Sequence, residues 1–157
     1  MNFEKGFIAK ESIKYIFKSI NQYKIHSPFV YEIYNKIFRN KGEYYTYKEI
    51  ELLRYKLLGT KECLTIKDFG ARKNEGIRQV SVSRIVKNSS TPSKYGQLLF
   101  RLVNYFRPNN IIELGTSLGI TTAYLAKANE KATVYTFEGS DVLMEYAKKN
   151  ISKLNIN

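Results

Sequence analysis

Residues 109–138 read NNIIELGTSLGITTAYLAKANEKATVYTFE, and this stretch decides the fold. The apolar run Ile111–Leu114 predicts a short parallel strand that is buried on both faces. A glycine turn follows at Gly115–Gly119, and Ile120–Lys127 then has spacing that is compatible with a helix. Val134–Phe137 is β-branched and aromatic, which predicts a second strand. The stretch therefore predicts the order strand, glycine turn, helix, strand.

The same stretch predicts half of a site for a ligand that contains adenosine. A glycine turn at a helix N-terminus presents free N–H groups and a positive dipole end to an anion. Glu138 closes the second strand about 20 residues later, where an acid can accept two ribose hydroxyls. A dinucleotide fingerprint requires G-x-G-x-x-G, whereas the glycines here are spaced G-x-x-x-G with Glu113 two residues before the first. This spacing disfavours a dinucleotide cofactor.

Residues 113–121, ELGTSLGIT, resemble the first motif of class I S-adenosylmethionine (SAM) dependent methyltransferases, in the form closest to the small-molecule O-methyltransferase branch. Residues 135–138, YTFE, are similar to the second motif of that family, whose acid holds the ribose. Residues 92–99, PSKYGQLL, resemble the helix that precedes the first strand in that branch. The resemblance covers about residues 91–157.

The resemblance implies SAM as the cofactor and six residues that would bind it: Glu113, Gly115, Ser117, Gly119, Thr121 and Glu138. By this resemblance, the two glycines would let the backbone pass close to the methionine part of SAM. Glu113 would support the site near the amino group of the cofactor. Ser117 and Thr121 would bind its carboxylate through backbone N–H groups, and Glu138 would hold the ribose hydroxyls.

The expected fold class is α/β: an N-terminal helical region, residues 1–90, followed by the first β-α-β-α of an incomplete Rossmann-like SAM-binding domain, residues 91–157. The family that this resembles has a seven-stranded sheet, so we expect the chain to be the front portion of a longer methyltransferase. Its catalytic residues would then lie beyond Asn157 and are unknown. The full enzyme would transfer a methyl group to an O or N acceptor. The alternative is a non-catalytic binding or self-association module with a vestigial nucleotide half-site.

Residues 115–119 also spell G-x-S-x-G, the nucleophile elbow of α/β-hydrolases. That site needs a histidine after the serine, but the only histidine is His26, far upstream of Ser117. A catalytic base at His26 is conceivable, although a lone histidine beside a helix cap is more often structural. Residues 68–70, DFG, match a kinase tripeptide without the other kinase motifs, so this match is chance.

The composition narrows the class of protein. One cysteine among 157 residues excludes an internal disulfide and a cysteine-cluster metal site, so we expect a reducing compartment and no metal. No stretch has the pattern of a signal peptide or a membrane span, and we expect a cytoplasmic protein.

The net charge is +12, and residues 1–90 hold 18 Lys and Arg against 9 Asp and Glu. RNA binding stays open, but the interspersed acids favour a solvated surface over nucleic-acid contact. By the resemblance, we expect a small-molecule acceptor rather than nucleic acid, with a homo-oligomer possible.

The region before residue 91 predicts helices over residues 3–22, 28–38 and 45–58, with a short one at 81–87. Ser27 and Pro28 form a cap and a first helical position, and Phe29, Ile37 and Phe38 are expected to point inward. Residues 60–80 lose periodicity, and we expect a polar surface loop near 68–80. Beyond residue 91, a helix is expected from residue 92 to about 106, with an apolar stripe of Leu98, Leu99, Leu102, Val103 and Phe106. A last helix is expected from about residue 140 onward, with an inward face of Val142, Leu143, Tyr146, Ala147, Ile151 and Leu154.

Overall fold

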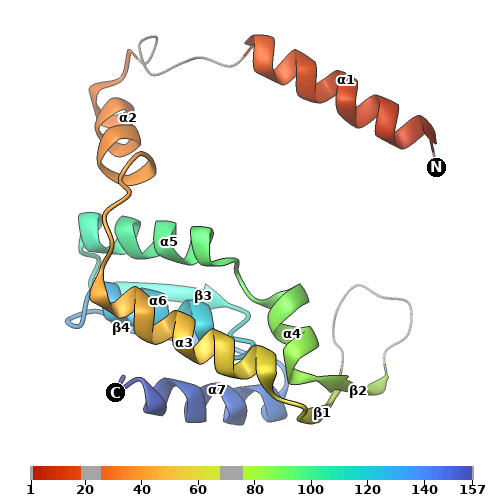
Figure 1. The fold of residues 1–157 in the computed structure, drawn as a ribbon. Helices are drawn as coiled ribbons and strands as arrows, with labels where there is room; N and C mark the ends of the chain where they lie inside the picture. The colour runs from red at the N-terminus through yellow and green to blue at the C-terminus, as the bar shows by residue number, and fades with distance from the viewer. Residues whose placement is uncertain (1, 19–25, 68–75, 157) are drawn as a thin grey trace. The chain divides into compact units, whose positions relative to one another are not determined.

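The computed structural model describes residues 2–18, 26–67 and 76–156, which form two compact units, residues 1–40 and 41–157 (Figure 1). The first unit contains helix α1, Asn2–Lys18, helix α2, Pro28–Ile33, and a π-helical segment η2, Tyr34–Phe38. The polar loop expected at 68–80 lies largely outside the described residues. The predicted domain boundary at residue 90 stays a prediction.

In the first unit, α2 begins as the sequence predicts. The Ser27 hydroxyl accepts a hydrogen bond from the backbone N–H of Val30 at 3.4 Å, and Pro28 opens the helix. The predicted inward face is only partly right, because Ile37 is fully buried whereas Phe29 is 58% exposed and Phe38 is 56% exposed. The π-helical turn shifts Phe38 away from the 3.6-residue period on which the prediction relied, whereas Phe29 precedes this turn and its exposure is not explained by it.

The second unit begins with helix α3, Tyr45–Gly59, which buries Ile50, Leu53 and Leu57 as predicted. It continues with a β-hairpin that the sequence did not predict: β1, Cys63–Lys67, pairs antiparallel with β2, Ile77–Ser81. Helix α4 follows at Val82–Ser89. The expectation of a purely helical region before residue 91 is therefore wrong.

The rest of the second unit has the predicted order. Helix α5 spans Ser93–Phe106, β3 spans Asn110–Leu114, α6 spans Ile120–Ala128, β4 spans Thr133–Phe137 and α7 spans Asp141–Lys153. Strands β3 and β4 pair in parallel, with Ile112 beside Tyr135 and Leu114 beside Phe137. In Figure 1 this sheet lies among α3, α5, α6 and α7. The described part of the chain is thus a mixed α/β structure with two short sheets.

Helix α6 is the centre of the core. It packs against α3, α5, α7 and β4, and its Ala123 and Tyr124 are fully buried. Tyr47 and Phe100 meet edge to face at a ring-centroid distance of 5.1 Å, and Tyr47 also contacts Tyr124 edge to face at 5.8 Å. Aromatic pairs at these distances stabilise a core beyond the area that they bury. This aromatic group joins α3, α5 and α6 into the layer that supports β3 and β4.

Three expectations about burial are wrong. Strand β3 is not buried on both faces, because Ile112 is 71% exposed and Leu114 is 84% exposed. On α5, Phe100 is buried and Phe106 is 48% exposed. On α7, Val142 was expected inward but is 42% exposed. Each error came from assigning apolar residues to the core without knowing which faces have a neighbouring element. Among the described residues, no helix is long and apolar enough to cross a bilayer.

Candidate functional site

The turn between β3 and α6 has an unusual backbone. Gly115, Ser117 and Gly119 have φ values of +94°, +51° and +78°, so three alternate residues are left-handed. The N–H of Gly119 donates to the carbonyl of Thr116 at 2.9 Å and closes the turn. Glycine adopts such angles without steric cost, but serine does so at a cost. A Cβ at Gly115 would meet no atom within 4 Å, so the backbone there faces open space that a ligand could enter.

The acid at the end of β4, Glu138, contacts this turn. The backbone N–H of Ser117 donates to Glu138 Oε2 at 2.7 Å, and the N–H of Ser140 donates to Glu138 Oε1 at 3.1 Å. Both carboxyl oxygens therefore have a backbone donor. The pairing places a negative charge and a left-handed backbone N–H side by side at the carboxyl ends of β3 and β4.

Glu113 supports the turn from the covered side of the sheet. It is only 9% exposed, and its Oε2 accepts hydrogen bonds from the hydroxyls of Thr122 and Thr136, both at 2.6 Å. The Thr136 hydroxyl also hydrogen-bonds the Thr116 hydroxyl. A buried carboxyl group is tolerated only when hydrogen bonds replace its hydration. Glu113 thus links β3, β4, α6 and the turn.

A cavity of about 180 Å³ lies beside the turn. Four of the predicted site residues line it, namely Glu113, Gly115, Ser117 and Thr121. The Ser117 Oγ is buried and has no hydrogen-bond partner among the described residues. A buried hydroxyl without a partner costs free energy, which a bound polar group would recover. The cavity is thus suited to a small polar group.

Two predicted residues do not line this cavity. Glu138 reaches the site only through its bond to the Ser117 N–H. Gly119 faces α7, where a Cβ would lie 3.2 Å from Ile151 Cγ1 and 3.3 Å from the Ala147 carbonyl oxygen. The close approach that Gly119 permits in this structure is therefore between the turn and α7.

One wall of the cavity beside the turn is formed by a segment that the sequence did not indicate as part of the site. Ser89, Ser90 and Thr91 line the same cavity, and the Thr121 hydroxyl donates to the Thr91 hydroxyl at 2.9 Å. This segment joins α4 to α5. The segment is rich in hydroxyl side chains, but this is only a weak indication of a binding site, because serine and threonine are common in the loops between helices.

Glu51 and Arg54 on α3 hold that wall in place. Arg54 donates from Nη2 to the Thr91 carbonyl at 2.8 Å and from Nε to Glu51 Oε1 at 3.0 Å. Glu51 also accepts from the Ser93 hydroxyl at 2.6 Å and from the Tyr124 hydroxyl at 2.7 Å. Burial acts to raise the pKa of Glu51, but the hydrogen bonds from Ser93 and Tyr124 and the Arg54 cation outweigh it and lower that pKa. Burial, together with the hydrogen bond to Glu51 and the charge of that carboxylate, raises the pKa of Tyr124, although the Arg54 cation acts to lower it.

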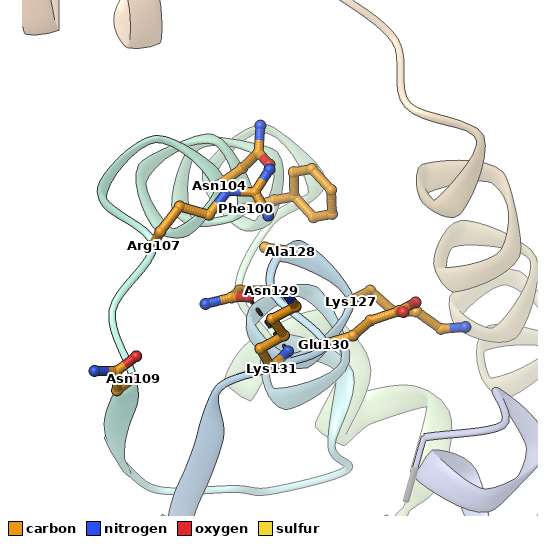
Figure 2. A pocket seen from close by; sticks show the side chains of 9 residues that line it. All are labelled: Phe100, Asn104, Arg107, Asn109, Lys127, Ala128, Asn129, Glu130 and Lys131. Carbon is orange, nitrogen blue, oxygen red and sulfur yellow. Dashed lines mark hydrogen bonds between the residues drawn. The ribbon is translucent and has the colours of Figure 1, made fainter.

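A second cavity, of about 600 Å³, opens at the amino ends of β3 and β4 (Figure 2). Its charged lining residues are Arg107, Lys127, Glu130 and Lys131. The cations lie at or near the C-terminal ends of α5 and α6, where unpaired carbonyls favour positive charge. In addition, Lys127 contacts Glu49 at 3.6 Å. These charges therefore have a structural explanation.

The remaining sequence candidates do not join the site. His26 is exposed and belongs to the first unit, while the turn belongs to the second. The DFG tripeptide at 68–70 lies outside the described residues. Among the described residues, no group of three or more His, Cys, Asp and Glu side chains is placed to hold a metal ion.

No protein-family model matches the sequence, and no curated protein matches it either. One solved structure is similar in fold, described as "a putative O-methyltransferase from Klebsiella pneumoniae". The two chains are 15% identical, the TM-score is 0.46, and the similarity covers 76% of this chain and 43% of the other. This chain thus spans less than half the length of that protein. A TM-score this low supports no inference, so the function has to be argued from the site itself.

Proposed function

We propose that this chain binds SAM through the glycine turn 113–121 and Glu138 and is part of a SAM-dependent methyltransferase. One observation carries the proposal: at the carboxyl ends of two parallel strands, a left-handed glycine turn, a strand-end acid and a buried serine hydroxyl without a partner converge. Ligands of open α/β sheets bind at these strand ends. The motif resemblance selects SAM among ligands that contain adenosine.

The residues fit the amino-acid part of SAM. The cavity of about 180 Å³ is smaller than the roughly 300–1,000 Å³ of sites that enclose a whole ligand of drug size. It would hold the methionine end, with the carboxylate near the Ser117 N–H and Oγ and the first N–H groups of α6. Gly115 leaves open space for the chain of the ligand, and Glu113 fixes the turn from the covered side.

The ribose would lie against Glu138. A carboxylate accepts two vicinal hydroxyls, and charge-assisted hydrogen bonds of this kind are stronger than neutral ones. In this structure both oxygens of Glu138 accept from backbone N–H groups. Carboxylate oxygens have further lone pairs, so Glu138 can keep its bond to Ser140 while it accepts from a ribose. The bond to Ser117 would give way to the carboxylate of the ligand.

SAM supplies a methyl group on a sulfonium sulfur, which a nucleophilic O or N of the acceptor displaces in line. In such a transfer, holding the two partners in line supplies much of the rate. The residues described here would bind and orient the cofactor. The acceptor, a small molecule by the proposal, and the residues that contact it are not assigned.

Calorimetric titration of S-adenosylhomocysteine into the folded 157-residue chain tests the proposal. We expect saturable binding with one site per chain, weakened about tenfold or more by Glu138→Ala, since charge-assisted bonds contribute about 1.5–3 kcal/mol. Glu130→Ala is the matched control, because Glu130 is exposed and lies before β4 rather than after it. Absence of binding to a chain that circular dichroism shows to be folded would contradict the proposal. Equal weakening by both substitutions would contradict the role of Glu138.

A further inference from the structure

Asn150 on α7 is a polar side chain in an apolar environment. It is fully buried, and the other buried residues of α7 are Leu143 and Ala147. Its Nδ2 donates to the Leu118 carbonyl at 3.0 Å, whereas its Oδ1 has no hydrogen-bond partner among the described residues. A carbonyl can only accept, so the amide nitrogen has to face Leu118. An unpaired buried oxygen destabilises a fold and a leucine would avoid this cost, so stability alone does not account for the asparagine.

The hydrogen bond from Asn150 orients the peptide group that closes the glycine turn. The Leu118 carbonyl and the Gly119 N–H belong to one planar trans peptide, so they point in opposite directions. The carbonyl accepts from Asn150, and the N–H donates to the Thr116 carbonyl at 2.9 Å. Because the peptide is rigid, holding its carbonyl against α7 directs its N–H toward Thr116. Asn150 therefore acts on the bond that closes the turn.

This turn needs a constraint from outside itself. Gly119 has a φ of +78°, and glycine can leave such a conformation more easily than any other residue. Ser117 has a φ of +51°, which costs a serine free energy and persists only where the surroundings hold it. Asn150 lies 32 residues beyond Leu118 in the chain and supplies such a constraint from a regular helix. Both partners of this bond are fully buried, so water does not compete for it.

We infer that Asn150 is a positioning residue of the binding site beside the turn. Leu118, Ile120 and Thr121 line the cavity of about 180 Å³ together with Ser117. The orientation of the Leu118–Gly119 peptide therefore sets where the Ser117 hydroxyl and the first N–H groups of α6 lie. Asn150 itself is not among the lining residues, so it acts on a ligand only through the turn. The inference rests on the proposed function for the identity of the ligand, but the effect of Asn150 on the turn does not.

Amide hydrogen exchange of the ligand-free chain, followed by NMR, tests the effect on the turn. Asn150→Ala removes the donor to Leu118, so the Gly119 N–H should exchange about tenfold or more faster relative to the amides of α3. Leu154→Ala is the matched control. It also shortens a buried side chain, at the C-terminal end of α7, but Leu154 does not bond to the turn. It should speed the exchange of the core amides alike and leave that of Gly119 unchanged relative to them.

Calorimetric titration of S-adenosylhomocysteine into the same variants tests the effect on binding. Asn150→Ala should raise the dissociation constant about tenfold or more, whereas Leu154→Ala should leave it unchanged. Asn150→Leu nearly keeps the buried volume and removes the unpaired oxygen, so its Tm should stay within about 4 °C of that of the original chain. It should nevertheless lose as much affinity as Asn150→Ala. A residue that only stabilised the fold would not lower affinity without lowering the Tm.

The two measurements separate the possible failures. If the relative exchange of Gly119 is unchanged in both Asn150 variants, or rises equally in Leu154→Ala, the effect of Asn150 on the turn is overturned. Faster exchange with unchanged affinity would overturn the positioning role. A folded original chain that does not bind S-adenosylhomocysteine would contradict the proposed function, and the exchange of Gly119 would still decide whether Asn150 holds the turn.

Discussion

The covered and open faces of one small sheet can be compared residue by residue. The covered face carries the alternate residues Ile111, Glu113, Val134 and Thr136, and the open face carries Ile112, Leu114, Tyr135 and Phe137. The covered face thus combines two apolar and two polar side chains, whereas the open face carries four large apolar ones, unlike the solvated face of an ordinary sheet. The inward polar groups are all paired through Glu113, Thr122 and Thr136. The difference shows that the polar contacts of the sheet lie beside the glycine turn, whereas no described element covers its apolar face.

The largest effect is expected from removing the polar centre of the covered face. Glu113→Ala removes the acceptor of the Thr122 and Thr136 hydroxyls, of which Thr136 keeps its bond to Thr116, and it opens a cavity in a buried place. We expect a loss of about 2–4 kcal/mol in the free energy of unfolding. Urea denaturation followed by circular dichroism measures it. A loss below about 1 kcal/mol would show that water replaces the missing carboxyl group and that the covered face does not depend on it.

A smaller loss is expected from crowding the helices behind the covered face. A Cβ at Gly96 on α5 would lie 2.6 Å from Cδ2 and Cε2 of Tyr124, whose ring is fully buried. We expect Gly96→Ala to lower the free energy of unfolding by about 1–3 kcal/mol, because the ring cannot move without repacking. Gly59→Ala is the control, since its Cβ would meet nothing within 4 Å. If the two variants unfold alike, the packing of α5 on α6 is looser than described.

A pH-dependent effect is expected at the wall of the cavity. Because the folded state lowers the pKa of Glu51 from 4.5, Glu51 contributes stability above about pH 4.5 and this contribution is lost as the pH falls through the lowered value. Glu51→Gln should therefore flatten the acid side of a plot of stability against pH. Thermal melts between about pH 3 and 7 measure this slope. An unchanged slope would mean that other carboxyl groups dominate acid unfolding.

The smallest effect is expected on the open face. Ile112→Thr keeps a β-branched side chain on a strand position that is 71% exposed, so the free energy of unfolding should change by no more than about 0.5 kcal/mol. The measurement has to be made at concentrations where the chain is monomeric. A loss comparable to that of Glu113→Ala would show that Ile112 is covered within a single chain, and the contrast between the two faces would disappear.

The parts of the fold that were predicted are those with local signals. The glycine turn, the two parallel strands and helices α3, α5, α6 and α7 follow from residue spacing and turn chemistry. The β1–β2 hairpin was missed although Leu64, Ile66 and Val80 alternate with exposed residues. Each strand has only five residues, and such short alternations are common by chance.

Contacts between distant residues could not be predicted from one sequence. Glu51 meets Ser93 and Tyr124, which are 42 and 73 residues away. No local sequence pattern indicates such long-range contacts, so the cavity wall formed by Ser89, Ser90 and Thr91 was not predicted. Likewise, an apolar strand looks the same in sequence whether one or both of its faces are covered within the chain. The open face of β3 therefore became visible only when the elements were in place.

The ionisation of the fully buried Tyr124 can be followed by ultraviolet absorbance. The chain has 13 tyrosines and no tryptophan, so its absorbance in alkali reports tyrosine ionisation alone. Burial and the bond to Glu51 raise the pKa of Tyr124, while burial and the bond to Glu62 raise that of Tyr146 to about 12. A tyrosine whose pKa is raised in the folded state contributes stability below pH 10 and loses it as the pH rises. The Tyr124 hydroxyl on α6 donates to Glu51 on α3, so its ionisation breaks this contact. In an alkaline titration, the ionisation of Tyr124 therefore reports the separation of α6 from α3.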